Sequence, residues 1–181
     1  MLPCLLVKRL PDYLRPGLDL VFVGINPGIK SAQTGHHYAG PGNHFWPLLY
    51  ASGLVTEPLT WEQDARVLEW NIGLTNMVDR PSRSVSDLTP QELRAGAARL
   101  RRKLARVAPR VVCFNGKRIH DVYAGRPAPL GLQPGGPTGP LIFVMPSTSA
   151  RTASYQRADK LEFFRQLKRI VERARAKETA S

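Results

Sequence analysis

Side chains able to hold water or a ligand directly follow three short apolar runs of the sequence. They are Asn-Pro-Gly at 26–28, Asn-Gly-Lys at 115–117 and Pro-Ser-Thr-Ser at 146–149. An amide does not titrate, so Asn26 is no strong base, but its carbonyl oxygen can hold a water molecule and its amide group can donate. On its own, Gly-Ile-Asn-Pro-Gly is also the sequence of a plain turn between a strand and a helix. The loop that follows it therefore matters.

That loop, residues 35–46, concentrates glycine, imidazole and aromatic side chains in Gly-His-His-Tyr-Ala-Gly-Pro-Gly-Asn-His-Phe-Trp. A glycine-rich loop packing on Phe45 and Trp46 would not explain the His-His-Tyr triplet. Adjacent histidines such as His36 and His37 rarely point into one metal site, and no cysteine or third ligand stands nearby. We therefore expect no zinc here.

The elements that must position these residues follow from the apolar pattern. Residues 20–25, 110–114 and 141–145 are short, continuous apolar runs that predict buried strands, and 70–74 is a weaker fourth. Continuous apolar strands are typical of parallel sheets that are covered on both faces. We predict an α/β fold with three layers, α/β/α, and a short, mainly parallel central sheet in one domain over 1–181 (core about 17–170). Ligands of such sheets bind beyond the carboxyl ends of the strands.

Helices fill the intervals between these strands. Thr89-Pro90-Gln91-Glu92 is a capping box that predicts a helix up to Pro109. A second basic amphipathic helix is expected over residues 159–176, and a short one from an Asn43 cap to Ser52. Residues 125–140 have no periodicity, which indicates a mobile surface loop.

The charge of the chain lies almost entirely in its second half. The 181 residues carry 26 Lys+Arg against 14 Asp+Glu, a net charge of +12, and residues 99–181 hold 18 of the basic side chains. A positive field of this size attracts nucleic acid. The plainer alternative is a solvated helix face, which is how we interpret the arginines of 99–106. The longest apolar runs, of five to six residues, are too short to span a membrane. Two cysteines exclude a disulfide framework and all-cysteine metal sites.

Two motifs in the correct order resemble the mismatch-specific uracil/thymine-DNA glycosylase family, within the uracil-DNA glycosylase superfamily. The first is the stretch 24–46, and the second is Met-Pro-Ser-Thr-Ser-Ala-Arg at 145–151. Segments 75–80, 114–117 and 132–134 are also similar to family segments. The pattern is nearer the thymine-DNA glycosylase version, because the bacterial mismatch-uracil version lacks the His-His-Tyr. The resemblance covers about residues 17–170.

The resemblance implies a hydrolase without metal or cofactor that flips a mispaired pyrimidine out of duplex DNA and cleaves its N-glycosidic bond. Asn26 matches the residue that positions the attacking water. Tyr38 matches the aromatic that stacks on the flipped base, and backbone groups near Ile25 would read the edge of that base. His37 is expected to reach the base or its phosphate, or else to be a solvated loop histidine. Further expected base-site residues are Ser31 and Asn76.

The second motif implies a loop that enters the minor groove and fills the gap left by the flipped nucleotide. Its expected DNA-binding residues are Pro146, Ser147, Thr148, Ser149, Ala150 and Arg151. Arg151 would stack in the gap or bind the orphaned guanine. Lys117 would touch a phosphate or merely begin a helix. Asp79 would assist the water or the sugar cation, or else pair with Arg80.

The resemblance implies a monofunctional glycosylase that excises uracil from G·U pairs in double-stranded DNA, with thymine in G·T pairs or other modified pyrimidines as further substrates. We expect no lyase step, because that needs an amine nucleophile beside the sugar. A non-catalytic nucleic-acid-binding domain that retained the glycosylase fold remains the alternative. We expect a monomer without membrane contact, in a bacterial cytoplasm beside the nucleoid rather than in a nucleus.

Overall fold

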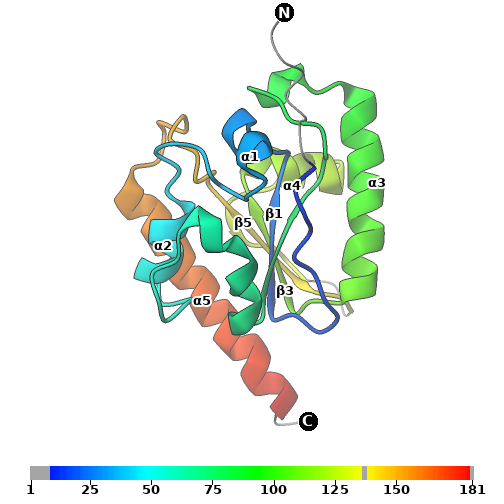
Figure 1. The fold of residues 1–181 in the computed structure, drawn as a ribbon. Coiled ribbons are helices and arrows are strands. Elements are labelled where there is room, and N and C mark those ends of the chain that lie inside the picture. Colours follow the sequence, from blue (N-terminus) through cyan, green and yellow to red (C-terminus); the bar gives the residue numbers. More distant parts are fainter. Residues whose placement is uncertain (1–8, 136–137, 180–181) are drawn as a thin grey trace, which may run out of the picture.

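The computed structural model, which describes residues 9–135 and 138–179, is built on a five-stranded sheet of order β2-β1-β3-β5-β4. Four strands run parallel: β1 (Leu20–Gly24), β2 (Ile72–Asn76), β3 (Val111–Asn115) and β5 (Leu141–Met145). The short β4 (Gly131–Leu132) runs antiparallel to β5. Helices cover both faces (Figure 1). The predicted three-layer fold with a mainly parallel sheet is confirmed, and each predicted strand occurs within two residues of its expected position.

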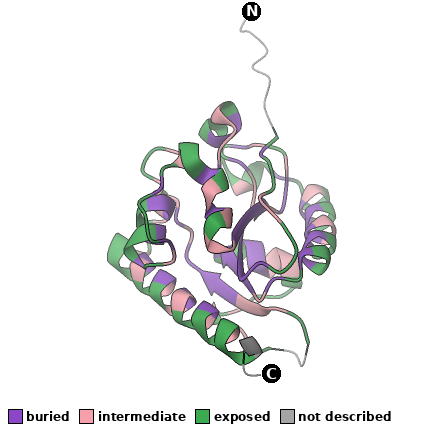
Figure 2. Ribbon diagram, turned by 60° about the horizontal axis from the view of Figure 1, so that its bottom comes forward, coloured by how far each residue is buried: buried purple, intermediate pink, exposed green. Residues whose placement is uncertain are grey.

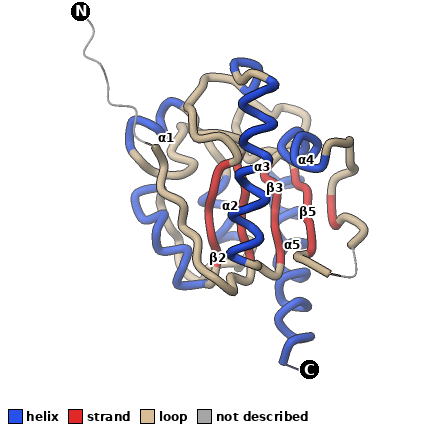
Figure 3. Tube along the Cα trace, turned by 90° about the vertical axis from the view of Figure 1, so that its right-hand side faces the viewer, coloured by secondary structure: helices blue, strands red, loops and turns tan. Residues whose placement is uncertain are grey.

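Alternating side chains of the strands build two separate cores. Leu20 and Phe22 of β1 pack with α2 (Phe45–Ala51), α5 (Arg157–Thr179) and the 3-10 helix η1 (Trp61–Trp70). Val21 and Val23 pack on the opposite face with α3 (Pro90–Val107) and α4 (Lys117–Ala124). Figure 3 shows helices on both sides of the strands, and in Figure 2 most of the central strand residues are buried while α5 turns exposed residues outward. No helix within the described ranges has the length and apolar character of a membrane span.

The predicted capping box fixes the start of α3. The Thr89 hydroxyl accepts from the Glu92 backbone N–H (3.2 Å), and the Glu92 carboxylate accepts from the Thr89 N–H (2.8 Å). The short helix α2 begins at Phe45, one residue later than an Asn43 cap implies, although the Asn43 side chain does accept from the Phe45 N–H (3.0 Å). Four helices were not predicted: α1 (Ile29–Thr34), η1, η2 (Val85–Asp87) and α4, of which only a start at Lys117 was an alternative.

The expectation of a structureless loop over 125–140 was wrong in part. Gly131 and Leu132 pair with Val144 and Phe143, and the Gln133 N–H donates to the Ile142 carbonyl at 2.9 Å. This pairing satisfies backbone groups along the open edge of β5. Residues 136–137 lie outside the described residues.

Gly96 lets α3 approach the backbone that leaves β2, which gives a stability prediction. A Cβ at Gly96 would lie 2.6 Å from the Met77 carbonyl oxygen and 2.9 Å from Val78 Cγ2. Although alanine is the better helix former, we expect Gly96→Ala to lower the free energy of unfolding by about 1–3 kcal/mol, because backbone must shift. Urea unfolding measures this. Gly135→Ala, with nothing within 4 Å of its Cβ, is the control, and equal midpoints for both variants would contradict the prediction.

Candidate active site

A cavity of about 600 Å³ opens at the carboxyl ends of the parallel strands. Residues that end or follow all four of these strands line it: Ile25 and Asn26 after β1, Asn76 on β2, Asn115 on β3, and Ser147 after β5. This is the end of the sheet at which α/β proteins bind ligands. The structure therefore brings together the three strand ends that the sequence singled out.

Asn26 is held at the cavity by its amide group. Its Nδ2 donates to the Arg80 carbonyl (2.9 Å) and to the Ser82 hydroxyl (2.8 Å), and that hydroxyl in turn donates to the Ser84 carbonyl (2.6 Å). Both amide hydrogens are thus engaged by protein. The carbonyl Oδ1 has no partner among the described residues, so it can accept a hydrogen bond from a water molecule.

Ser82 is a functional candidate that the sequence did not reveal. It is buried and lines the cavity, and its N–H donates to the Pro27 carbonyl at 3.2 Å. It therefore joins the turn after β1 to the loop after β2. A single serine six residues beyond a strand carries no pattern, so only the folded structure shows its contact with Asn26.

Tyr38 lines the cavity with its ring stacked on Phe45, at 3.9 Å between centroids and 19° between planes. Its backbone is left-handed (φ 55°), a conformation that costs a non-glycine residue about 1–2 kcal/mol. Burial raises the pKa of the hydroxyl well above its usual range, so the ring stays neutral. Phe45 thus supports one ring face of an aromatic that is available for stacking in the cavity.

His37 is buried rather than solvated, so the expectation of a solvated loop histidine was wrong. Its side chain is 2 % exposed, and its Nε2 lies 2.7 Å from the Pro11 carbonyl. Burial lowers the pKa of this imidazole. A carbonyl only accepts, so the neutral ring carries its proton on Nε2 and leaves Nδ1 as an acceptor.

Ser31, Ile25 and Asn76 stand at the cavity in different ways. The Ser31 hydroxyl accepts from the Ala39 N–H (3.1 Å), and the Ile25 carbonyl accepts from the Val78 N–H (2.8 Å). Asn76 packs against Gly24, where a Cβ would overlap its Oδ1. Only glycine at position 24 therefore lets the Asn76 amide approach the end of β1 so closely.

The segment Pro146–Arg151 is called the insertion loop from this point on, and it is firmly attached to the sheet. Asn115 Nδ2 donates to Thr148 Oγ1, and the Thr148 N–H donates to Asn115 Oδ1, both at 2.9 Å. Thr148 is 1 % exposed and Pro146 is also buried. The Thr148 side chain therefore anchors the loop, and contact of Pro146 and Thr148 with DNA stays a prediction.

The exposed part of the insertion loop lies at the mouth of the cavity. Ser147 and Ser149 accept from backbone N–H groups of their own loop (3.2 and 3.3 Å), while Ala150 and Arg151 are exposed. The Arg151 guanidinium donates to the Arg83 carbonyl (2.5 Å) on the other side of the cavity. Below the loop, the buried Lys160 ammonium donates to the Ser149 carbonyl (3.0 Å).

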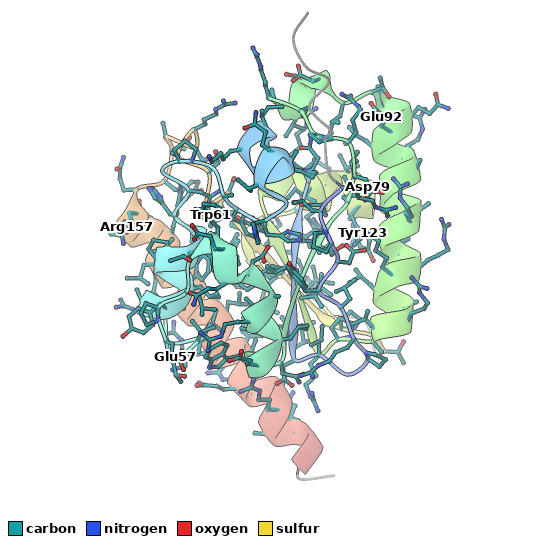
Figure 4. All side chains as sticks on the ribbon, viewed as in Figure 1. Glu57, Trp61, Asp79, Glu92, Tyr123 and Arg157 are labelled. Atoms are coloured by element: carbon teal, nitrogen blue, oxygen red, sulfur yellow. The ribbon has the colours of Figure 1, made fainter. Side chains whose placement is uncertain are left out.

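Three of the predicted site residues, Asp79, Lys117 and the buried Pro146, do not line the cavity. Asp79 lies beside α3 (Figure 4), where its carboxylate binds Arg9 (3.0 Å) and Arg99 (3.7 Å), while Arg80 binds Glu92. The expected Asp79–Arg80 pair was therefore wrong. Lys117 begins α4 and pairs with Asp121 on the next turn (2.7 Å). Within the described residues, no three His, Cys, Asp or Glu side chains are placed to hold a metal ion.

Comparison with known proteins agrees with this geometry. The sequence profile of the Uracil DNA glycosylase superfamily matches residues 11–171. A solution NMR structure from Methanosarcina acetivorans, provisionally described as a uracil DNA glycosylase, is similar in fold with a TM-score of 0.57. The two sequences are 21% identical, over 90% of this chain and 98% of that chain. This chain, with its cavity at the carboxyl ends of a parallel sheet, belongs to the uracil DNA glycosylase superfamily.

Proposed function

We propose that the protein is a monofunctional DNA glycosylase of the mismatch-specific type, nearer the thymine-DNA glycosylase version, which excises uracil opposite guanine. The observation that carries this proposal is the fixation of Asn26. Its two amide hydrogens are held by Arg80 and Ser82 (2.9 and 2.8 Å), which leaves its carbonyl oxygen to orient a water molecule in the cavity.

In the proposed reaction, this water adds to C1′ of the sugar. The bond between C1′ and the base nitrogen breaks, and its electron pair leaves with the base. The water then loses a proton to solvent, because the neutral amide of Asn26 does not take it up. Catalysis consists of placing the water near C1′. Without a carboxylate base in the cavity lining, turnover should be slow.

The base would stack on Tyr38, whose other face is supported by Phe45 (3.9 Å). Stacking on an aromatic ring accepts any pyrimidine. Selectivity would then come from flipping, which costs least at a mismatched pair. Ser31 is small and lines the same cavity, and it is our candidate for admitting the 5-methyl group of thymine.

We propose no lyase step. A lyase needs an amine that attacks the sugar, and nucleophilic lysines are commonly desolvated. Lys30 lines the cavity, but its side chain is exposed. A covalent adduct with DNA trapped by borohydride, and lost in Lys30→Met, would overturn this part of the proposal.

Single-turnover excision on four labelled substrates tests the function: G·U, G·T and A·U duplexes and single-stranded uracil, read as strand breaks after alkali. We expect G·U to be cleaved fastest. Equal rates on G·U and A·U would overturn the mismatch selectivity. DNA binding without abasic sites above background on any substrate would overturn the enzyme and support a non-catalytic binding domain.

Arg151→Ala gives a separate prediction for the insertion loop. Excision from a G·U duplex should fall about tenfold, the value of one charge-assisted hydrogen bond, while excision from single-stranded uracil stays unchanged. Arg157→Ala, which removes an exposed arginine outside the cavity lining, is the control. An equal loss on both substrates would contradict a role of Arg151 in filling the duplex gap.

A further inference from the structure

Asp64 is a buried carboxylate on η1 that no step of the proposed reaction uses. It is 1 % exposed. Its Oδ1 accepts from the Tyr13 hydroxyl (2.9 Å) and lies 3.0 Å from His36 Nδ1, and its Oδ2 accepts from the His37 backbone N–H (2.8 Å). Three groups from two distant segments of the chain thus converge on one carboxylate below the cavity.

An ionised carboxylate suits this place because it only accepts hydrogen bonds and has two oxygens for three partners. A buried charge is tolerated when hydrogen bonds satisfy it, as they do here. An asparagine has only one oxygen, so if that oxygen accepts from the His37 N–H, the Tyr13 hydroxyl and His36 Nδ1 must accept from its NH₂ group instead of donating. Asp64→Asn therefore either loses the contact to the His37 N–H or reverses the hydrogen bonds to Tyr13 and His36.

The contact to His37 matters most, because it is one of three that fix this residue. Asp64 holds its N–H, Trp46 Nε1 donates to its carbonyl (3.1 Å), and the Pro11 carbonyl binds its Nε2 (2.7 Å). The next residue is Tyr38 with its left-handed backbone. A conformation of this kind persists only where neighbouring contacts impose it.

We propose that Asp64 is a positioning residue that acts through Tyr38. By holding His37, it keeps the Tyr38 backbone left-handed and its ring stacked on Phe45, in the cavity where the flipped pyrimidine would bind. This inference rests on the proposed function. Asp64 itself touches neither the base nor the water and is absent from the cavity lining.

The first test is Asp64→Asn with Glu69→Gln as its matched control. Glu69 loses the same charge on the same helix, but it is exposed and pairs with Arg66 (2.9 Å). Single-turnover excision by Asp64→Asn should fall about tenfold on both single-stranded and duplex uracil, as expected for a displaced binding group. Duplex affinity should stay unchanged. A rate equal to that of Glu69→Gln would overturn the inference.

A double-mutant cycle separates positioning from general damage. In a Tyr38→Ala background, Asp64→Asn should change the rate by less than about twofold, because residues acting through one contact are not additive. Additive losses would mean that Asp64 supports the fold alone, which overturns the inference. Should Asp64→Asn not fold, Trp46→Phe removes another contact to His37 and should show the same dependence on Tyr38.

One readout does not need activity. Trp46 is bound to His37 and Trp61 packs on His36, with centroids 5.5 Å apart, so displacement of this segment should change tryptophan emission in Asp64→Asn and not in Glu69→Gln. Unchanged emission overturns the inference. Absence of excision in the wild type on every substrate would instead overturn the proposed function.

Discussion

Asn26→Ala is expected to bind a G·U duplex as tightly as the wild type, while its single-turnover excision rate falls about 10²- to 10³-fold. This is the loss typical when one positioned polar group is removed from a transition state. Asn26 is held within the cavity by Arg80 and Ser82, whereas contact with the duplex is expected from the exposed Arg151. Binding to DNA therefore does not depend on its amide.

Ser82→Ala provides the graded comparison for Asn26→Ala. It keeps the Asn26 side chain and removes one of the two acceptors of its amide (2.8 Å), so we expect a smaller loss of about tenfold. Both rates are measured under saturating enzyme, and affinities by fluorescence anisotropy. Excision by Asn26→Ala at the wild-type rate would remove Asn26 from the mechanism.

Phe45→Ala should lower the free energy of unfolding by about 3–5 kcal/mol, the range for a large aromatic removed from a packed core. Phe45 is fully buried, and its ring contacts those of Phe22, Tyr38, Trp46 and Phe164. For a chain of this length the melting temperature should fall by about 10 °C or more. Any remaining activity should be low, because Tyr38 loses the ring that supports it.

Two variants give the Phe45 prediction its controls. Phe45→Leu keeps the side chain apolar and most of its volume. It should therefore lower the free energy of unfolding by less than about 1.5 kcal/mol. Tyr50→Ala removes an aromatic from the same helix that is 45% exposed, so its stability should stay within about 0.5 kcal/mol of the wild type. A melting temperature of Phe45→Ala equal to that of Tyr50→Ala would contradict the packing described here.

Local signals in the sequence were enough for the sheet and for its longest helices. Continuous apolar runs predict parallel strands because both faces of such strands are buried, and the Thr89 capping box predicts the start of α3. The two-residue β4 has no pattern of its own, because its pairing depends on the neighbouring β5. The 3-10 helix η1 also lacks the apolar repeat of a regular helix, so Asp64 could not be placed in advance.

The candidate site was predictable where residues end a strand, as Asn115 does, or lie two residues beyond one, as Asn26 and Ser147 do. Position along the chain does not reveal which way a side chain turns. Thr148 turns inward to Asn115, and Asp79 turns to Arg9 and Arg99 instead of the cavity. The orientation of these side chains depends on partners from remote segments of the chain, and a single sequence does not reveal which segments come together.

The anchoring of the insertion loop has a consequence for the rate of DNA association. Thr148 is tied to Asn115 and His44, and the Ser149 carbonyl to Lys160. Fixing the backbone of a residue costs about 1–2 kcal/mol of conformational entropy, and here that cost arises during folding rather than on binding. The encounter with DNA should therefore be limited by diffusion and orientation, and the slow steps should follow it, in base flipping and in the chemistry itself.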